Sequence, residues 1–215
     1  PSNTALAVGK KIKYLLVETI NQYTGEFISV IIAKDLASKY FTAKNSKIQF
    51  ENYAKGDRNI PFKIIADFNG LKLNGIRYEQ LFSYAHPEDG DAFKVLIGDF
   101  VTTEDGTGIV HLAPSFGADD NRLAKKNGIG SLTLVDKQGK FNNKVADFAG
   151  MYVKDEFYKE GEVRPALSVD VQIAIMLKKK NRCFQSEKYE HSYPHCWRTD
   201  KPILYYPMDS WFVKT

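Results

Sequence analysis

The sequence predicts an α+β fold, mainly β, in which a small closed β-barrel is decorated by peripheral α-helices. Three observations support this prediction. The first two thirds of the chain contain several short strand-like runs separated by turn residues. Helical patterns are few and come later in the chain. The chain has 215 residues, of which 43% are hydrophobic, and this suits one domain of ordinary size with a proper core. Many short strands with few helices are typical of a closed barrel.

The expected strands lie mostly before residue 113. Six runs have strand-like composition: 11–20, 26–33, 61–68, 71–78, 93–101 and 108–112. The first two are separated by five residues ending in Gly25, which suits a hairpin. Asn69-Gly70 separates the third and fourth runs and is a second hairpin signal. The sequence therefore predicts two hairpins followed by two further strands.

Three helices are expected, and the clearest covers residues 118–126. It opens with Asp119 and Asp120 and ends in lysines, which suits the helix dipole. Residues 34–41 are predicted as a short helix. Residues 169–181 are also predicted as a helix, although their apolar residues alternate as a strand's would.

The last part of the chain is expected to be organised differently from the rest. From residue 185 the sequence reads as a strand ribbon with turns at Pro194 and Pro202. The predicted division is a barrel core over residues 1–185 and a ribbon over residues 186–215.

Composition limits the possible functions. Net charge is only +4, from 30 basic and 26 acidic residues, which excludes a strongly basic nucleic-acid binder but allows a modest contact with an RNA end. Two cysteines, Cys183 and Cys196, do not make a disulfide framework. No signal peptide and no apolar run of about 20 residues is present. We expect a cytoplasmic protein that does not enter the membrane.

The most informative motif runs from residue 106 to residue 120. It begins with the glycine turn Gly106-Thr107-Gly108, continues as a short strand that carries His111, and ends where Asp120 opens a helix. The histidine comes from a strand and the acids come from the loop-to-helix junction after it. This arrangement can form a small pocket with polar groups at its base, which binds an amine and selects a side chain by its size.

The motif resembles the hydrolytic editing site of the isoleucyl-tRNA synthetase family, large class I enzymes that insert an editing domain into their catalytic domain. Residues 1–9 resemble the segment that enters this domain, and residues 191–198 with 210–212 resemble the segment that leaves it. The valyl and leucyl families usually have Lys and Met at the position of His111. His111 followed by Ala113-Pro114 therefore favours the isoleucyl family.

The resemblance implies a reaction and its partners. The fold would be a β-barrel with peripheral helices, and the reaction would be hydrolysis of valine wrongly esterified to tRNA(Ile), with valyl-adenylate as a further substrate left open. The partners would be the valine-bearing 3′ end of tRNA(Ile) and the catalytic domain of the same polypeptide, in a monomer. The domain would need no cofactor, although the full-length enzyme uses ATP and Mg. The alternatives are a valyl- or leucyl-type editing domain and a tRNA-docking module without catalysis.

Two residues are the catalytic candidates. Asp120 lies nine residues after His111, at the family position whose carboxylate pairs with the substrate ammonium; the alternative is a helix cap, a role expected for its neighbour Asp119. His111 could transfer a proton or simply be a core residue. The resemblance implies instead that it lines the side-chain pocket, where it admits valine and crowds the extra methylene of isoleucine.

The remaining predicted substrate-binding residues are Asn3, Gly106, Thr107 and Gly108, of which the glycines would bring backbone N–H groups close to a ligand. The family also has a threonine-rich segment before the position of Pro1, which helps to hold the terminal adenosine and the water. Because the sequence begins at Pro1, we expect the chain to fold but to hydrolyse poorly.

No metal site is expected. His191, His195 and Cys196 could suggest zinc, but Cys196-Trp197-Arg198-Thr199 has only one cysteine where some relatives have Cys-x-x-Cys.

Overall fold

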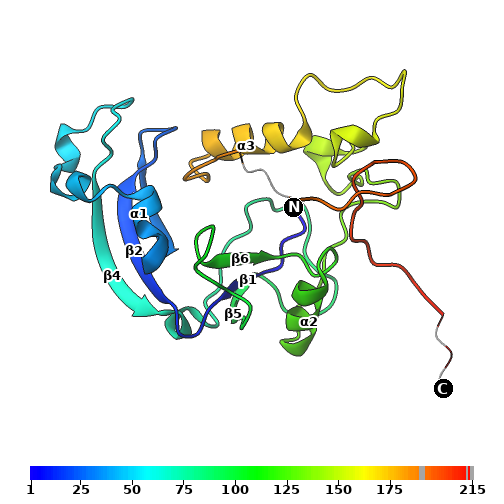
Figure 1. The fold of residues 1–215 in the computed structure, drawn as a ribbon, viewed down its shortest axis with the longest axis horizontal. Coiled ribbons are helices and arrows are strands. Elements are labelled where there is room, and N and C mark those ends of the chain that lie inside the picture. Colours follow the sequence, from blue (N-terminus) through cyan, green and yellow to red (C-terminus); the bar gives the residue numbers. More distant parts are fainter. Residues whose placement is uncertain (189–191, 212, 214–215) are drawn as a thin grey trace.

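The computed structural model describes residues 1–188, 192–211 and 213, and its strands form two open three-stranded sheets (Figure 1). The first sheet has the order β5-β1-β6. Its central strand β1 (Ala5–Val8) pairs in parallel with β5 (Lys94–Ile97) and antiparallel with β6 (Ile109–Leu112). This sheet carries His111, so it is the part of the fold that positions the predicted motif.

The second sheet has the order β3-β2-β4 and lies beside the first in Figure 1. Strands β2 (Lys13–Ile20) and β3 (Phe27–Ala33) form the predicted hairpin, and β4 (Phe62–Asn69) pairs antiparallel with the other edge of β2. Gly25 closes the hairpin turn at a φ of 78°, a left-handed conformation that favours glycine. The first hairpin prediction is thus confirmed.

The predicted closed barrel is wrong, because the described strands form two open sheets. At one seam the Ala33 N–H donates to the carbonyl of Thr107 at 2.8 Å. On the far side of the first sheet, residues 75–78 make backbone hydrogen bonds to residues 93–95 around a bridge between Arg77 and Lys94, but they do not form a strand. No backbone hydrogen bond among the described residues joins residues 75–78 to β4, so the ring stays open there.

The second predicted hairpin is also wrong, and the reason lies at Gly70. The chain leaves β4 through a 3-10 turn over Gly70–Leu73 instead of reversing into a strand. The Gly70 N–H donates to the Ile12 carbonyl, and a side chain at this position would meet the Gly9 carbonyl oxygen at 2.2 Å. This glycine therefore permits a close approach of two backbones rather than a hairpin turn.

Strand β1 was not among the predicted strands. Ala5, Ala7 and Val8 are fully buried and contribute to two different hydrophobic clusters, one on each side of the sheet. A strand that is buried on both faces shows no polar alternation, so its pattern does not reveal it. The predicted strand 93–101 is real but shorter, since β5 begins after Phe93, which has a left-handed φ of 56°.

The helices agree with the predictions. Residues 34–40 form a 3-10 turn followed by α1 (Ala37–Tyr40), α2 covers Ala118–Lys126, and α3 covers Val169–Lys179. The Ser168 hydroxyl caps α3 by accepting the Val171 N–H at 3.4 Å. The alternating pattern in this segment therefore did not produce a strand. No helix in the described part of the chain combines the length and apolar character needed to cross a membrane.

Helix α3 crosses above the first sheet in Figure 1, with β1 and β6 below it. Its first residue, Val169, packs in a hydrophobic cluster with residues of the 132–148 region, and its far end approaches the β2–β3 hairpin. The helix thus bridges two parts of the molecule that are distant in sequence.

The described part of residues 186–215 contains one antiparallel bridge, between His195 and Pro202, in the place of the expected ribbon. The segment also contacts the rest of the chain. Leu204 packs against the cluster that contains Val169, and the Tyr206 hydroxyl donates to the Val135 carbonyl at 3.0 Å.

Candidate functional site

An apolar pocket of about 450 Å³ lies between the first sheet and α3. Its walls come from four separate parts of the chain: the first residues, the loop after Gly75, strand β6 and helix α3. The hydrophobic lining residues are Pro1, Leu6, Leu81, Phe82, Ile173 and Leu177, and the polar ones are Asn3, Tyr78, Glu79, Gln80 and His111. The pocket thus combines a largely apolar interior with a few polar groups, as sites for small ligands commonly do.

His111 lies on β6, directly opposite Leu6 of β1 in the antiparallel register. Its neighbours Val110 and Leu112 pack in the hydrophobic cluster on the other side of the sheet, so the alternation of the strand turns His111 toward the pocket. The side chain is exposed, and no described residue hydrogen-bonds its imidazole. His111 is therefore a wall residue without a partner that would orient it as a base.

Asn3 is held in place at the edge of the same pocket. Its Nδ2 donates to the carbonyls of Ala5 at 2.7 Å and Leu112 at 3.2 Å, and its Oδ1 accepts the Tyr78 hydroxyl at 2.5 Å. Every hydrogen-bonding atom of this amide has a partner within the protein. Asn3 consequently shapes the pocket edge and ties β6 to the chain segment that enters β1.

Gln80 contributes a polar atom without a partner. Its Nε2 donates to the Ala85 carbonyl at 2.9 Å, which fixes the orientation of the amide. Its Oε1 is buried and has no hydrogen-bond partner among the described residues. A buried acceptor left unpaired is costly, so such groups need an explanation. Gln80 lines the pocket, but this oxygen lies beneath the pocket surface, where neither solvent nor a ligand contacts it.

Asp120 lies in the first turn of α2, outside the lining of this pocket. Its Oδ2 accepts the Ala113 N–H at 2.8 Å, a bond that fixes the chain two residues after His111. Asp119, its neighbour, forms an exposed ion pair with Arg122 at 3.0 Å and does not cap the helix. The visible contact of Asp120 is therefore structural, and its predicted catalytic role stays a prediction.

The glycine turn lies at the seam between the two sheets. The Gly106 and Gly108 carbonyls accept the hydroxyls of Tyr40 and Tyr14 at 3.0 and 2.6 Å, and burial raises the pKa of the Tyr14 hydroxyl. Thr107, between them, accepts the backbone N–H of Ala33. None of the three turn residues lines the apolar pocket.

The structure thus brings together two of the six predicted site residues, Asn3 and His111, from chain positions 108 residues apart. The pocket residues that sequence reasoning missed lie in the loop after Gly75 and on α3. For α3 the sequence did contain an indication of a shared apolar surface, because Ile173 and Leu177 are four residues apart and lie on one face of a helix.

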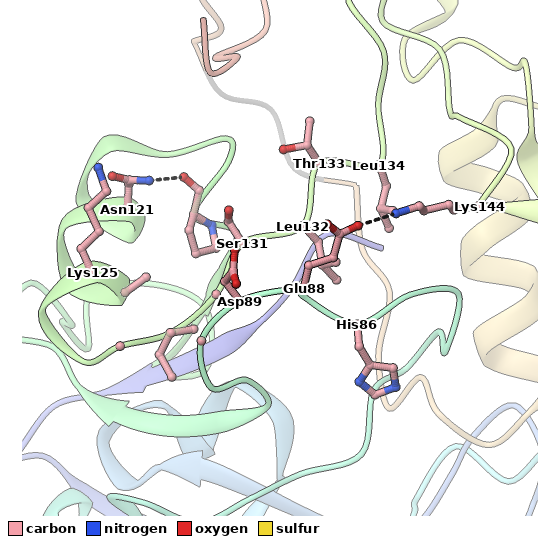
Figure 2. Close-up of a pocket in the computed structure, with 16 residues that line it drawn as sticks. His86, Glu88, Asp89, Asn121, Lys125, Ser131, Leu132, Thr133, Leu134 and Lys144 are labelled. Carbon is pink, nitrogen blue, oxygen red and sulfur yellow. Dashed lines mark hydrogen bonds and ion pairs between the residues drawn. The ribbon is translucent and has the colours of Figure 1, made fainter. Parts of the chain in front are cut away.

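A second cavity, of about 580 Å³, is lined mainly by residues of the 86–90 and 128–134 segments and of α2 (Figure 2). Figure 2 shows Asn121 and Lys125 of α2 at one side and Lys144 at the other, where Lys144 pairs with Glu88 at 3.4 Å. Its wall carries both charge signs and His86, and none of the predicted site residues lines it. It is larger than the apolar pocket but more polar and more open to solvent.

The zinc alternative gains no support in the part of the chain that the structure describes, where no three His, Cys, Asp or Glu side chains form a cluster. The His195 imidazole contacts the Tyr193 carbonyl instead. His191, which completes the considered set, lies outside the described residues, as does Phe212 of the matching segment.

Comparison with known proteins supplies the family. No protein-family model matches the chain. Over its whole length it is 54% identical to an isoleucine–tRNA ligase of Cytophaga hutchinsonii and 47% identical to one of Bacteroides fragilis, covering 21% of each enzyme. For the isoleucine–tRNA ligase of Clostridium acetobutylicum the identity is 42% and the share of the enzyme is 17%. The chain therefore spans about a fifth of the length of these relatives.

A solved structure titled "The crystal structure of GlLeuRS-CP1" is 20% identical, with a TM-score of 0.37, and the match covers 58% of this chain and 38% of that one. This similarity is too low to bear on the fold. The relatives in sequence are decisive, because three isoleucine–tRNA ligases match the chain from end to end at 42 to 54% identity. The chain belongs to the isoleucyl-tRNA synthetase family.

Proposed function

We propose that this chain is the editing domain of an isoleucyl-tRNA synthetase and hydrolyses valine wrongly esterified to tRNA(Ile). The observation that carries the proposal is the apolar pocket with Asn3 at its edge and His111 in its wall, in a chain of this family. A pocket of this size and character suits an aliphatic side chain, with polar groups at the edge where the ester and the ammonium would lie.

The need for such a site is physical. One methylene is worth only about 1–3 kcal/mol of discrimination, so a synthetic site cannot exclude valine well enough, and this synthetase is itself the standard worked case of that limit. A second site that admits the smaller side chain and rejects the larger one solves the problem. The apolar walls of the pocket provide the surface against which size is measured.

In the proposed reaction water attacks the ester carbonyl, the bond between the acyl carbon and the ribose oxygen breaks, and the products are free valine and a tRNA with its ribose hydroxyl restored. His111 has no hydrogen-bond partner among the described residues, which favours a role as a wall over a role as a base. Positioning of the substrate would then carry the rate, helped by the free hydroxyl of the terminal ribose. Asp120 remains the proposed partner of the ammonium; its Oδ1 accepts no hydrogen bond from the described residues. The proposed hydrolysis uses no cofactor.

The proposed partners are the 3′ end of tRNA(Ile) and the catalytic domain of the same polypeptide. The competing function is docking of tRNA without catalysis, which is favoured by the engagement of Asp120 with the Ala113 N–H. Pro1 lines the pocket, so a threonine-rich segment placed before it would reach the same space.

The test is hydrolysis of Val-tRNA(Ile) by three proteins: the chain as given, the same chain extended at its first residue by the threonine-rich segment, and the full-length enzyme. We expect weak activity in the first and stronger activity in the other two. If the full-length enzyme binds tRNA(Ile) but leaves Val-tRNA(Ile) intact, the domain is a docking module. Equal activity of the two shorter proteins would show that the threonine segment is dispensable.

A further inference from the structure

We infer that helix α3 is the roof of the pocket and that Ile173 and Leu177 limit the size of the aliphatic side chain that the pocket accepts. This inference rests on the proposed function, since it concerns the same pocket. It assigns size selection to two opposed walls, with His111 in one and α3 in the other.

The first argument is the orientation of α3. Ile173 and Leu177 are half-buried, and both line the pocket. Val171 and Ile175 lie two residues before each of them, about 200° around the helix, and are 43% and 37% exposed. The helix thus has aliphatic residues on two faces, and only one of these faces is turned into the pocket.

The second argument is that α3 is fixed at its first turn. The Ser168 hydroxyl caps the helix at the Val171 N–H, and the Gln172 side chain donates to the Leu167 carbonyl at 2.8 Å. Val169 is only 3% exposed and packs in a hydrophobic cluster. This end of the helix is anchored in the part of the molecule that does not contain the sheets.

The other end of α3 is fixed to the β2–β3 hairpin. The Lys178 ammonium lies 4.5 Å from the centre of the Tyr23 ring. Two residues after the helix, the Asn181 side chain accepts the Thr24 hydroxyl at 2.9 Å and donates to the Phe27 carbonyl at 3.2 Å. Because α3 is held at both ends, it cannot easily move away from the first sheet. The width of the pocket between α3 and the sheet therefore depends on the side chains that α3 directs into it.

The third argument is the position of the roof relative to the polar edge. In Figure 1, α3 passes above β1 and β6. His111 and Leu6 are paired neighbours on these two strands, and both line the same pocket. A substrate held at the polar edge by its ester and ammonium would extend its side chain between the sheet and α3. An added methylene would then meet Ile173 or Leu177.

The test compares two pocket variants of the full-length enzyme, Ile173→Ala and Leu177→Ala, with two controls on the opposite face, Val171→Ala and Ile175→Ala. The measured quantity is the rate of hydrolysis of Ile-tRNA(Ile) divided by that of Val-tRNA(Ile). We expect the pocket variants to raise this ratio about tenfold or more, the low end of the discrimination that one methylene allows. We expect the controls to leave the ratio unchanged.

Leu177→Phe gives an independent test in the opposite direction, in case truncation of the roof unfolds the domain. The larger ring should reduce hydrolysis of Val-tRNA(Ile) as well. Binding supplies a readout that does not require hydrolysis, through the dissociation constants of two non-cleavable amide analogues, adenosine carrying valine and adenosine carrying isoleucine. Leu177→Ala should shift the preference toward the isoleucine analogue.

These outcomes separate the roof from the proposed function. If the wild-type enzyme hydrolyses neither ester but Leu177→Ala still shifts the binding preference toward the isoleucine analogue, the proposed editing is wrong and the roof inference holds. If the wild type hydrolyses valine and both pocket variants keep the wild-type ratios for hydrolysis and binding, the roof inference is wrong. A wild-type enzyme that binds neither analogue overturns both.

Discussion

The Tyr78 hydroxyl donates a 2.5 Å hydrogen bond to Oδ1 of Asn3, and this contact determines which way the Asn3 amide faces. With Oδ1 engaged, Nδ2 is directed to the carbonyls of Ala5 and Leu112. Burial raises the pKa of Tyr78 well above its usual value of about 10, because the charged phenolate is poorly solvated there. At neutral pH the hydroxyl is therefore a protonated donor, and the edge of the pocket is fixed.

Tyr78→Phe should lower the free energy of unfolding at pH 7 by about 1 kcal/mol, because it removes one half-buried hydrogen bond. The wild type should also be the more sensitive to alkali. Above about pH 10 the unfolded chain releases the Tyr78 proton while the folded chain retains it, so stability falls as pH rises. Urea unfolding of both proteins at pH 7 and about pH 11 measures this difference. Parallel losses in the two proteins would show that Tyr78 does not carry this effect.

Gly108→Ala should destabilise the fold more than Gly106→Ala does. Both glycines have positive φ, 74° and 66°, which costs an alanine about 1–2 kcal/mol. At Gly108 the added Cβ would also meet the Ala33 Cβ at 2.5 Å, whereas nothing lies within 4 Å at Gly106. Urea unfolding should show a loss of about 1–2 kcal/mol at Gly106 and clearly more at Gly108. Equal losses would mean that the seam between the sheets relaxes freely.

The sequence predicted individual elements better than their assembly. The β2–β3 hairpin and α2 were predictable because turn residues and helix-dipole charges act locally. The arrangement of the strands as two open sheets instead of a closed barrel was not, because it depends on hydrogen bonds between strands distant in sequence. At Gly70 the local pattern was misleading, since a tertiary contact with Gly9 requires the glycine.

The candidate site shows the same division. Asn3 and His111 were identified through a resemblance in short motifs, and the structure places both at one pocket. Tyr78 and the roof residues Ile173 and Leu177 were not identified. No pattern along the chain states that α3 crosses the first sheet, because that arrangement follows from the anchoring of its two ends.

Two variants of Asp120 separate its structural role from its predicted catalytic role. In Asp120→Asn an amide oxygen can still accept the Ala113 N–H, but the negative charge is gone. If the carboxylate pairs with the substrate ammonium, both Asp120→Asn and Asp120→Ala should lose most hydrolysis of Val-tRNA(Ile), by about 1.5–3 kcal/mol or more in the full-length enzyme.

Synthesis of Ile-tRNA(Ile) is the control for Asp120, because that chemistry belongs to another domain and should be nearly unchanged. Thermal unfolding of the chain reports the structural role. If Asp120→Asn keeps full editing while Asp120→Ala unfolds the domain, Asp120 only holds the exit from β6. Undiminished editing in both variants would remove Asp120 from the site.

His111→Ala is the most discriminating change, because a general base and a steric wall predict opposite results. If His111 takes a proton from water, its truncation should slow hydrolysis of every substrate. If His111 measures size, truncation opens one wall of the pocket, and Ile-tRNA(Ile), the correct product, should begin to be hydrolysed. Valine should still be removed.

We expect His111→Ala to give the result predicted for the loss of a steric wall. His111 lies opposite Leu6 on the lining of an apolar pocket, and no described residue orients its imidazole. A base needs such a partner to hold the correct tautomer, whereas a wall needs only a fixed backbone, which the β1–β6 pairing provides. The measurement is deacylation of purified Ile-tRNA(Ile) and Val-tRNA(Ile) by the wild-type and His111→Ala full-length enzymes. A variant that loses valine hydrolysis and gains none toward isoleucine would contradict the wall and support the base.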